Sequence, residues 1–298
     1  MSTSPWADLS RPPLRQAALR RAVLDGRGPW TSLDVVPATG STNADLAARA
    51  RSGRALAGAV LTTDDQQAGR GRRDRVWSAP PRSALAVSAL VQPDDVPRAL
   101  WSWLPLVVGL AVSDALVAVA EVPAVLKWPN DVLLDGRKVC GVLVEVVDGP
   151  PASDGGRPGS AAVLGMGVNV LQGRAELPVP TATSLLLEGA AVTDRDTVLR
   201  AVLRSLGRRY TAWAAAGGDP TASGTAAAYR ERCDTIGRPV RVDLPGGAVL
   251  TGRAEGVDDD GRLLVRADGA APGAAPQALA AGDVEHVRPT GDGPTQPA

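Results

Sequence analysis

The sequence predicts an α/β protein in two parts, a larger domain of strands and helices followed by a small β-barrel. Two observations carry this prediction. Apolar runs of strand length alternate with runs of helix length as far as about residue 235, and only short strand-like runs joined by glycine-rich turns follow. The chain has 298 residues, of which 44% are hydrophobic, so both parts can bury a core.

The larger domain begins with alternating helices and strands. A short amphipathic helix is expected at residues 14–25, and strands at 32–36, 59–63 and 83–91. Between the first two strands, Ser41, Thr42 and Asn43 precede an alanine-rich run at 44–50. Because a hydroxyl or amide can cap the first turn of a helix, this segment predicts a strand-to-helix turn whose backbone N–H groups face outward.

Two segments of the larger domain stand apart in composition. Residues 66–75, QQAGRGRRDR, are too polar and too rich in glycine for a helix or a strand, and they predict a long mobile loop. Residues 101–120 are apolar over a length that suits a membrane span. Pro105, Ser113 and Asp114 interrupt this run and basic flanks are lacking, so a buried core helix is favoured and no membrane partner is expected.

The rest of the chain completes both domains. Strands are expected at 125–127, 132–134, 139–147 and 161–170, helices at 194–216 and 221–233, and barrel strands at 240–244, 249–254 and 263–267. Residues 149–160 predict a disordered connection, and the tail from Pro289 is expected to fray. The predicted domains are therefore residues 30–235 and 236–290.

Composition narrows the class of protein. Basic and acidic residues number 32 each, so a formal net charge of zero argues against binding nucleic acid through bulk charge. Two cysteines and a single histidine exclude a disulfide framework and a Cys/His zinc cluster, and no protein-held metal is expected. The N-terminal segment lacks the apolar run of a secretory signal, so the expected compartment is the cytoplasm.

The residue types that the chain hardly uses mark its candidate site. Only two of the 32 basic residues are lysines, Lys127 and Lys138, and the three asparagines are Asn43, Asn130 and Asn169. Lysine and asparagine have A/T-rich codons, and phenylalanine, which shares this property, is absent. A GC-rich genome tends to replace such residues, so those that remain indicate chemistry that requires them.

The basic loop is the first cluster that can carry chemistry. Gly69 and Gly71 let the backbone approach a ligand closely. The arginines offer forked donors that match phosphate or carboxylate oxygens; they are Arg70, Arg72, Arg73 and Arg75. By itself the loop suits a small polyphosphate ligand, an RNA-binding patch or a solvated run of charge, but it is neither a Walker loop nor a dinucleotide fingerprint.

Two further clusters lie in the predicted hairpins. In KWPND, residues 127–131, the compact ammonium group of Lys127 suits a position between an attacking carboxylate and a phosphoryl oxygen, where the forked guanidinium group is too broad. The alternative is an ordinary surface turn. In GMGVNV, residues 165–170, the glycines indicate a close ligand approach that brings Asn169 near a ligand, or a tight strand crossing.

The motifs together resemble those of the biotin protein ligases, also called biotin–[acetyl-CoA-carboxylase] ligases. In chain order they are GSTN (40–43), QQAGRGRRDRVW (66–77), LKWPNDVLLDGRKVCGVLVE (126–145), GMGVNV (165–170) and TSLLLE (183–188). The resemblance covers about residues 30–290. It implies an α/β fold with a mixed-sheet catalytic domain of the class II synthetase and lipoate ligase type, and a C-terminal SH3-like barrel.

The resemblance implies a reaction in two steps. The biotin carboxylate attacks the α-phosphorus of ATP, which binds with Mg²⁺, and gives biotinyl-5′-AMP and pyrophosphate. A lysine of a biotin carboxyl carrier domain, the implied partner, then attacks this anhydride. Lys127 and Arg72 are the implied catalytic residues.

The implied binding residues follow from the same motifs. Those for biotin are Ser41, Thr42, Asn43, Gln66, Arg70, Gly71, Arg72 and Lys127. Those for the nucleotide are Arg70, Arg72, Arg73, Lys127, Asn130, Lys138 and Asn169, and Glu145 is a further candidate for a nucleotide, metal or structural role. The loop would fold over biotin and the adenylate phosphate and shield the anhydride from water.

Two departures and two alternatives accompany this resemblance. Asp74 stands where the family loop usually has glycine, which adds a negative charge to the loop. About 30 residues precede the catalytic domain, too few for a winged helix-turn-helix, so a ligase-only member is expected, as a monomer or weak dimer without a nucleic-acid partner. The nearest alternative is a lipoate–protein ligase, and the alternative from another class is an RNA- or DNA-binding module.

Overall fold

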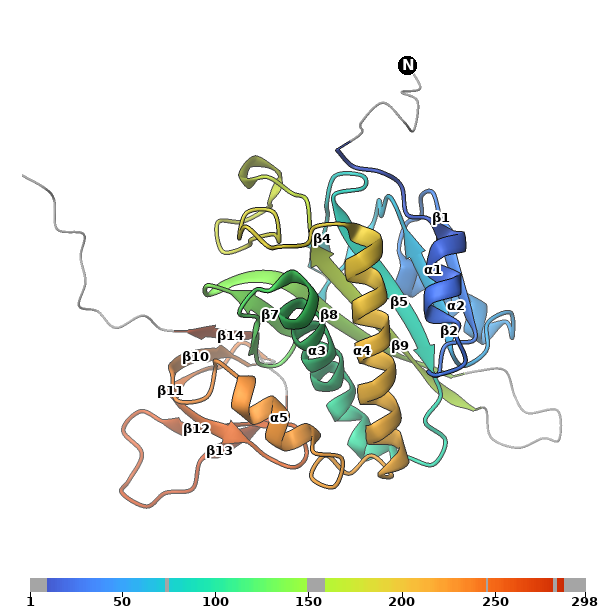
Figure 1. Cartoon of the computed structure of the whole chain (residues 1–298). Coiled ribbons are helices and arrows are strands. Elements are labelled where there is room, and N and C mark those ends of the chain that lie inside the picture. The colour runs from blue at the N-terminus through green and yellow to red at the C-terminus, as the bar shows by residue number, and fades with distance from the viewer. Residues whose placement is uncertain (1–9, 73–74, 149–158, 245, 281–282, 287–298) are drawn as a thin grey trace, which may run out of the picture.

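A seven-stranded mixed sheet forms the centre of the computed structural model, which describes residues 10–72, 75–148, 159–244, 246–280 and 283–286 (Figure 1). The strand order is β1-β2-β5-β9-β8-β7-β6. The strands are β1 (Ser32–Val36), β2 (Ala59–Thr63), β5 (Ala84–Val91), β6 (Val125–Lys127), β7 (Asp131–Leu134), β8 (Arg137–Asp148) and β9 (Ser160–Asn169). The β1–β2 pair is parallel and the other pairs are antiparallel, so the predicted mixed sheet is confirmed.

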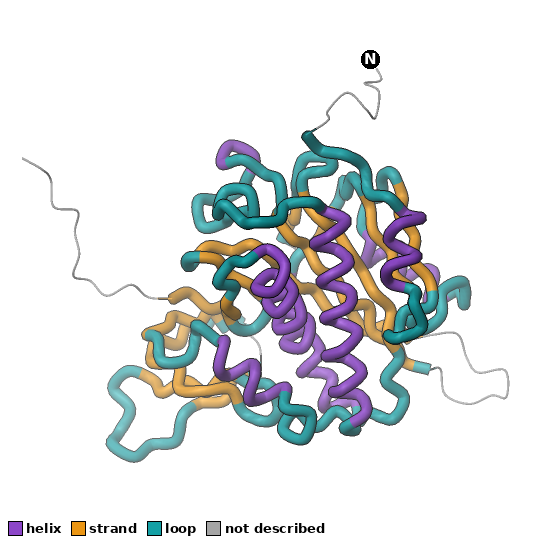
Figure 2. The backbone as a smooth tube through the Cα atoms, in the orientation of Figure 1, coloured by secondary structure: helices purple, strands orange, loops and turns teal. Residues whose placement is uncertain are grey.

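Helices cover both faces of this sheet (Figure 2). On one face α3 (Leu104–Ala115) and α4 (Arg195–Ala215) pack side by side, with α1 (Gln16–Val23) next to α4. On the other face α2 (Thr42–Arg51) packs on β5, β9, β2 and β8. Large apolar side chains fill the layer between the sheet and α3. On the face that α2 covers, polar groups occupy part of the sheet.

The predicted core helix lies in the middle of the apolar layer. A continuous helical stretch consists of η2 (Arg98–Trp103), α3 and the π-helical turn η3 (Leu116–Ala120), and all of α3 except Pro105 and Asp114 is buried. Among the described residues this is the one helix that is long and apolar enough to cross a membrane, with a mean hydropathy of 2.0. Since 72% of its apolar stretch is buried inside the protein, it serves as a core helix.

A second sheet follows α5 (Thr225–Arg232). It is antiparallel with five strands in the order β13-β12-β11-β10-β14. The strands are β10 (Pro239–Asp243), β11 (Val249–Val257), β12 (Leu263–Ala267), β13 (Gln277–Leu279) and β14 (Asp283–His286). The sequence analysis missed β13 and β14, because QAL and DVEH together contain a single β-branched residue and no aromatic one to indicate a strand. The small C-terminal β domain is confirmed, while its SH3-like form and the boundary at residue 235 stay predictions.

Two tryptophans join the domains through their indole N–H groups. Trp128 Nε1 donates to the carbonyl of Gly261 at 3.0 Å, and Trp103 Nε1 donates to the carbonyl of Asp259 at 2.7 Å. Both rings are buried, so each supplies apolar area and a satisfied polar group at the same contact. The β11–β12 turn is therefore held against the core of the first domain.

The remaining predicted elements agree with the structure, with one exception. Residues 66–75 were expected to lack secondary structure, but β3 (Gly69–Arg70) pairs with β4 (Val76–Trp77), so that prediction is wrong. Short strands form there because glycine lets the two backbones approach closely. Of the connection predicted at 149–160, residues 149–158 lie outside the described residues, as do the tail from Pro289, Arg73 and Asp74, while Ser160 already belongs to β9.

Substitution of Asp194 tests the start of α4. The carboxylate accepts a hydrogen bond from the backbone N–H of Thr197 at 2.8 Å and caps the first turn. We expect Asp194→Ala to lower the free energy of unfolding by about 1 kcal/mol, measured by denaturant titration. Asp194→Asn keeps a capping oxygen and should stay close to wild type; equal losses in both variants would contradict the assignment.

Candidate active site

One row of paired residues crosses the sheet beneath the predicted site. Side chains of directly opposed residues on neighbouring strands lie on the same face. Successive pairs join β5, β9, β8, β7 and β6 through Ala86, Gly167, Gly141, Asp131 and Lys127, here called the floor row. Its middle has no side chain larger than a methyl group, and a carboxylate and an ammonium group stand at one end.

The floor row faces the α2 side of the sheet. Leu126, the neighbour of Lys127, is buried, and its Cδ2 lies 3.6 Å from the position of a Cβ on Gly109 of α3. Because successive residues of a strand point to opposite faces, Lys127 faces away from α3. The sequence-predicted lysine therefore stands on the same face as the N-terminus of α2.

The N-terminus of α2 rests on a second row, two residues further along the strands. In this row Ser88 pairs with Gly165 and Gly165 pairs with Leu143. A Cβ on Gly165 would lie 2.2 Å from Asn43 Oδ1. Asn43 can therefore reach into the sheet only because residue 165 is glycine. GMGVNV was interpreted as a close ligand approach or as a tight strand crossing, but the group that approaches Gly165 is the protein's own helix α2.

A network of neutral polar groups surrounds this contact. Ser88 Oγ donates to Asn43 Oδ1 at 2.6 Å and lies 2.8 Å from Thr42 Oγ1. Thr42 donates to Gln66 Oε1 from its backbone N at 2.9 Å and from its Oγ1 at 3.1 Å. Ser41 caps α2 by accepting from the backbone N–H of Ala44 at 3.4 Å. The three residues predicted from GSTN and the predicted Gln66 are thus brought together.

Glu145 connects this network to the basic loop. Asn43 Nδ2 donates to Glu145 Oε2 at 2.7 Å and to the carbonyl of Leu143 at 3.2 Å. Arg70 Nη2 lies 3.4 Å from Glu145 Oε1. The Asn43 amide is therefore held at both ends, with its oxygen toward Ser88 and its nitrogen toward Glu145, and one carboxylate contacts both the helix and the loop.

The β3–β4 hairpin brings an aromatic ring onto the floor row. A Cβ on Gly69 would lie 2.4 Å from the carbonyl oxygen of Trp77 and 2.5 Å from Gln66 Nε2, so only glycine fits between them. A Cβ on Gly167 would lie 2.7 Å from the indole of Trp77. Gly69 thus allows a close approach within the protein, and a Cβ on Gly71 would meet nothing nearer than 3.4 Å, the carbonyl oxygen of Arg75.

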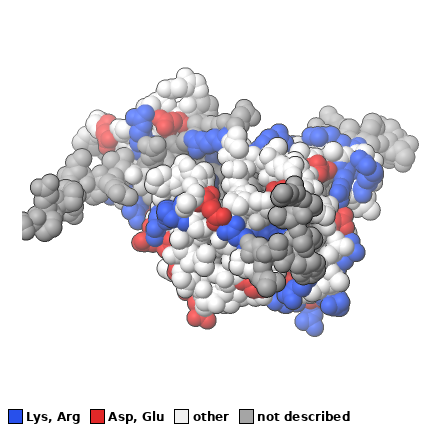
Figure 3. Space-filling model, turned by 90° about the horizontal axis from the view of Figure 1, so that it is seen from above, with Lys and Arg blue, Asp and Glu red and all other residues white. Residues whose placement is uncertain are grey.

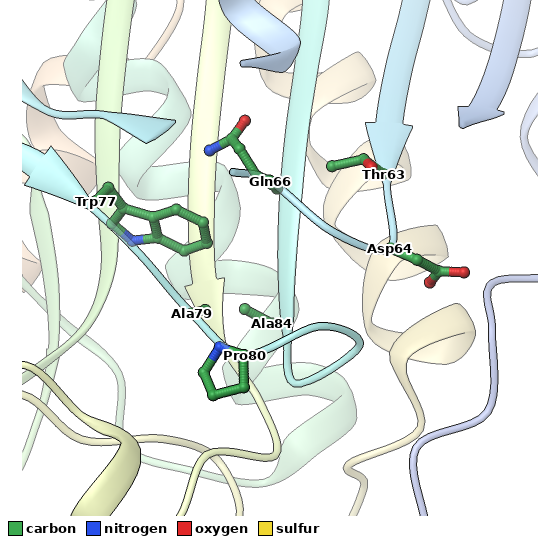
Figure 4. A pocket seen from close by; sticks show the side chains of 8 residues that line it. Thr63, Asp64, Gln66, Trp77, Ala79, Pro80 and Ala84 are labelled. Atoms are coloured by element: carbon green, nitrogen blue, oxygen red, sulfur yellow. The ribbon is translucent and has the colours of Figure 1, made fainter. Parts of the chain in front are cut away.

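Trp77 and Gln66 also border a small pocket (Figure 4). In Figure 4 the ring of Trp77 and the side chain of Gln66 lie on the same side of the strands, with Pro80 and two alanines close by. The lining residues are Thr63, Asp64, Gln66, Trp77, Ala79, Pro80, Ala84 and Ala86. Small apolar groups and a few polar groups therefore meet where the floor row begins.

The basic loop also touches the KWPND turn. Arg72 Nη1 donates to Asn130 Oδ1 at 3.2 Å, and Asn130 Nδ2 donates to the carbonyl of Val142 at 2.9 Å. Within the loop, Gly71 N donates to the carbonyl of Arg75 at 2.7 Å. Two motifs that are far apart in sequence therefore meet through the predicted residues Arg72 and Asn130.

A β-bulge places the second lysine on the same face. Val132 pairs with Cys140 but Leu133 pairs with Lys138, so Val139 is an extra residue in β8. Lys138 Nζ lies 2.5 Å from Asp131 Oδ1 and 2.9 Å from the position of a Cβ on Gly141. Without the bulge, Lys138 and Gly141 would point to opposite faces.

Cys140 lies on the apolar side of the same strand. Burial raises the pKa of its thiol to about 12, although the nearby Lys138 ammonium group opposes this shift. Cys233 is also buried, and burial raises the pKa of its thiol as well. Neither cysteine is therefore a thiolate near neutral pH, so a cysteine nucleophile is not part of this site.

Asn169 binds other parts of the protein. Its Nδ2 donates to the carbonyl of Thr183 at 2.9 Å, and its Oδ1 accepts from Gln172 Nε2 at 3.0 Å. These bonds tie the TSLLLE segment to the end of β9. A contact of Asn169 with the nucleotide stays a prediction, and the geometry gives it a structural role.

Two residues of the site escaped the sequence prediction as functional residues, Ser88 and Trp77. Ser88 is a fully buried serine in a strand that is otherwise apolar, and that contrast was the signal for it. Trp77 lies inside a quoted motif, but only the hairpin shows that its ring covers Gly167. Among the described residues, no group of three or more His, Cys, Asp or Glu side chains can hold a metal ion.

Charge is mixed in sign on one face of the molecule. On the face shown in Figure 3, described lysines and arginines are interspersed with aspartates and glutamates. This distribution agrees with the formal net charge of zero. It differs from the single basic stripe that is typical of a nucleic-acid footprint.

Comparison with known proteins identifies the family. The model of the biotin/lipoate A/B protein ligase family matches residues 35–157, and that of the biotin protein ligase C terminal domain matches residues 235–287. The chain is 43% identical to a biotin–[acetyl-CoA-carboxylase] ligase of Mycobacterium tuberculosis over 94% of its own length and 98% of the relative's. The protein belongs to the biotin protein ligase family.

Other biotin protein ligases are similar to this chain in sequence and fold. The bifunctional ligase/repressor BirA of Escherichia coli is 32% identical over 80% of this chain and 70% of its own. The structure of the biotin protein ligase of Aquifex aeolicus in complex with biotin and ATP superposes with a TM-score of 0.68 and 28% identity, covering 87% of this chain and all of that one. The predicted family is therefore confirmed.

Substitution of Gly165 tests the contact between α2 and the sheet. An alanine Cβ at 2.2 Å from Asn43 Oδ1 forces the helix terminus outward and breaks its bond to Ser88. We expect Gly165→Ala to lower the free energy of unfolding by about 1–3 kcal/mol in a denaturant titration. Gly109→Ala is the matched control, because its Cβ meets nothing closer than 3.6 Å and alanine suits a helix; equal stability of both variants would contradict the tight contact.

Proposed function

We propose that this protein is a biotin–[acetyl-CoA-carboxylase] ligase. It activates biotin with ATP to biotinyl-5′-AMP and transfers biotin to a lysine of a biotin carboxyl carrier domain. The activity named for the Mycobacterium tuberculosis relative and the biotin and ATP bound by the Aquifex aeolicus structure support this proposal. The roles of the individual residues below are part of it.

The observation that carries the proposal is that three groups lie on the same face of the central sheet. A neutral network of hydroxyl and amide groups lies at the α2 terminus, a floor of glycine lies under Trp77, and Lys127 stands at the end of the floor row. A ureido ring needs neutral donors and acceptors, a fused ring needs a flat apolar bed, and a carboxylate meeting a phosphate needs a cation. Biotin and ATP together require all three.

In the first step an oxygen of the biotin carboxylate bonds to the α-phosphorus of ATP and the bond to pyrophosphate breaks. Asn43, with Ser41, Thr42 and Gln66, holds the ureido ring. Lys127 contacts the biotin carboxylate and the α-phosphate, where its compact ammonium group neutralises charge that develops in the transition state. Arg72 reaches the same region from the loop, and its bond to Asn130 supports a loop that spans the site.

In the second step the ε-amine of the carrier lysine attacks the acyl carbon of the anhydride. The bond to AMP breaks and the amine loses a proton. Arg70, Gly71 and Arg72 cover the adenylate in the meantime and exclude water, which would hydrolyse it. Arg73 lies outside the described residues, and its nucleotide contact is carried over from the motif alone.

ATP binds as its Mg²⁺ complex, and this ion would neutralise charge on the departing pyrophosphate. Lys138, which forms an ion pair with Asp131, and Asn130, which accepts a hydrogen bond from Arg72, are proposed to contact the nucleotide. We further propose a cytoplasmic protein, a monomer or weak dimer, that binds neither membrane nor nucleic acid.

One experiment tests the function directly. The purified protein is incubated with ATP and a biotin carboxyl carrier domain, with biotin in one sample and lipoate in a matched sample, and acylation of the carrier lysine is measured by mass spectrometry. Labelling that depends on biotin and ATP is expected. Adenylate formation from lipoate but not from biotin would establish the lipoate ligase instead, and salt-sensitive oligonucleotide binding without pyrophosphate exchange would favour the nucleic-acid module.

Lys127→Arg tests the requirement for a compact cation. The variant keeps the charge, but its planar guanidinium group does not fit between the two oxygens. We expect biotin-dependent exchange of pyrophosphate into ATP to fall by about a hundredfold. Arg49→Lys, a charge-conserving change near the C-terminus of α2, serves as the control; near-normal exchange in Lys127→Arg would refute the point-charge argument.

Arg72→Gly tests whether the basic loop covers the adenylate. Loss of this side chain removes the bond to Asn130 and opens the site. We expect biotinyl-5′-AMP to leave at least about tenfold faster and to label lysines of unrelated proteins. Release is measured by rapid filtration, and retention equal to wild type would show that the loop has another role.

A further inference from the structure

The strand β14 ends beside the Lys127 segment of the catalytic domain. Its last residue, His286, is the single histidine of the chain, and its side chain is 17% exposed. His286 Nε2 lies 3.1 Å from Thr235 Oγ1. The same Oγ1 accepts a hydrogen bond from the backbone N–H of Trp128 at 3.0 Å. Thr235, which is fully buried, therefore joins the C-terminal sheet to the residue after Lys127.

The direction of the bond between His286 and Thr235 depends on which ring nitrogen carries the proton. Thr235 Oγ1 accepts from the backbone N–H of Trp128, and its hydroxyl proton can be donated to an unprotonated Nε2. A neutral imidazole that accepts at Nε2 carries its proton on Nδ1. Nδ1 lies 3.7 Å from the Asp234 carboxylate, which favours this tautomer. The chain of contacts thus runs from Asp234 through His286 and Thr235 to the Trp128 backbone.

The residue on the other side of Lys127 is held by the same segment. The backbone N–H of Asp234 donates to the carbonyl of Leu126 at 2.8 Å, and Leu126 forms a parallel bridge with Cys233. Lys127 therefore lies between two residues whose backbones are bonded to residues 233–235. Since β6 has only three residues and β7 as its one neighbour in the sheet, these bonds supply its second edge.

We infer that His286 is a positioning residue for adenylation, which acts through Thr235 and the Trp128 backbone to fix Lys127. This inference rests on the proposed role of Lys127 in biotin activation. It gives the C-terminal sheet a defined role, because the last described strand of that sheet supplies the acceptor that orients the Thr235 hydroxyl. A displacement of the reacting groups by about 1 Å is enough to cost a large factor in rate.

Burial and the charges around His286 keep the ring neutral at working pH. Its pKa is lowered to about 4, mainly by burial and also by the ammonium group of Lys127 and the guanidinium group of Arg238, while Asp234 opposes these effects. A second cation beside Lys127 is thereby avoided. Because the folded-state pKa lies below the ordinary value near 6.5, stability from this site is complete above about pH 6.5 and is lost as the pH falls through about 4.

Three variants of the full chain test the inference through biotin-dependent pyrophosphate exchange. His286→Leu removes the acceptor, and we expect kcat for adenylation to fall about tenfold while KM for biotin changes less than about twofold. His286→Gln can place an amide oxygen near the position of Nε2 and should restore at least about half of the wild-type kcat. Thr235→Val removes the hydroxyl group that links His286 to Trp128, and its kcat and KM should resemble those of His286→Leu.

Control measurements separate this role from general stability. Arg241→Leu removes an exposed ion pair with Asp243 in the same sheet and should leave kcat unchanged. The midpoint temperature of thermal unfolding should fall more steeply from pH 7 to pH 4 for wild type than for His286→Gln, because in this range the unfolded wild-type chain gains a proton at His286 that the folded protein does not bind until about pH 4.

The outcomes distinguish the inference from the proposed function. Wild-type kcat in a folded His286→Leu variant, or no rescue by His286→Gln, would overturn the role of His286. Absence of biotin-dependent exchange in the wild-type protein would overturn the proposed function itself.

Discussion

The candidate site depends on the missing side chains of two glycines in the central strand β9. The space at Gly165 admits Asn43 from α2, and the space at Gly167 admits the ring of Trp77 from the β3–β4 hairpin. Both neighbours lie under 3 Å from where a Cβ would be, so no other residue type fits without movement. Helix, hairpin and sheet therefore meet on one face, and the polar network around Ser88 follows from that contact.

The two faces of the central sheet divide stability and chemistry between them. The face under α3 and α4 is filled by large apolar side chains, and β5 is buried along its whole length. Such a face fixes the backbone rigidly, because a close-packed interior resists displacement. The opposite face carries the cations, amides and hydroxyls, and their separations are set by strand register. Rigid strands position a site more accurately than loops do.

Much of the fold and part of the site could be predicted from the sequence. The apolar run of α3 and the capping residues before α2 are local sequence patterns, and the structure contains the elements that they predict. The β3–β4 hairpin was missed, since polar composition outweighed the backbone pairing that Gly69 permits. Ser88 was missed because a serine that stands out in an apolar strand does not show which groups it will contact. The last two strands of the C-terminal sheet were missed because their residues have little β-branched or aromatic character.

The sequence by itself determined which reactive side chains the protein carries in its motifs, which helices and strands hold them, and the family to which the protein belongs. Lys127 and Asn43 could be named because their residue types are scarce in this chain and stand in specific motifs. Only the tertiary structure decided which of these groups share a face. A one-residue bulge turns Lys138 toward Asp131, and a strand more than 150 residues away brings His286 to the segment of Lys127. Register and domain packing are long-range constraints, and short-range sequence patterns do not encode them.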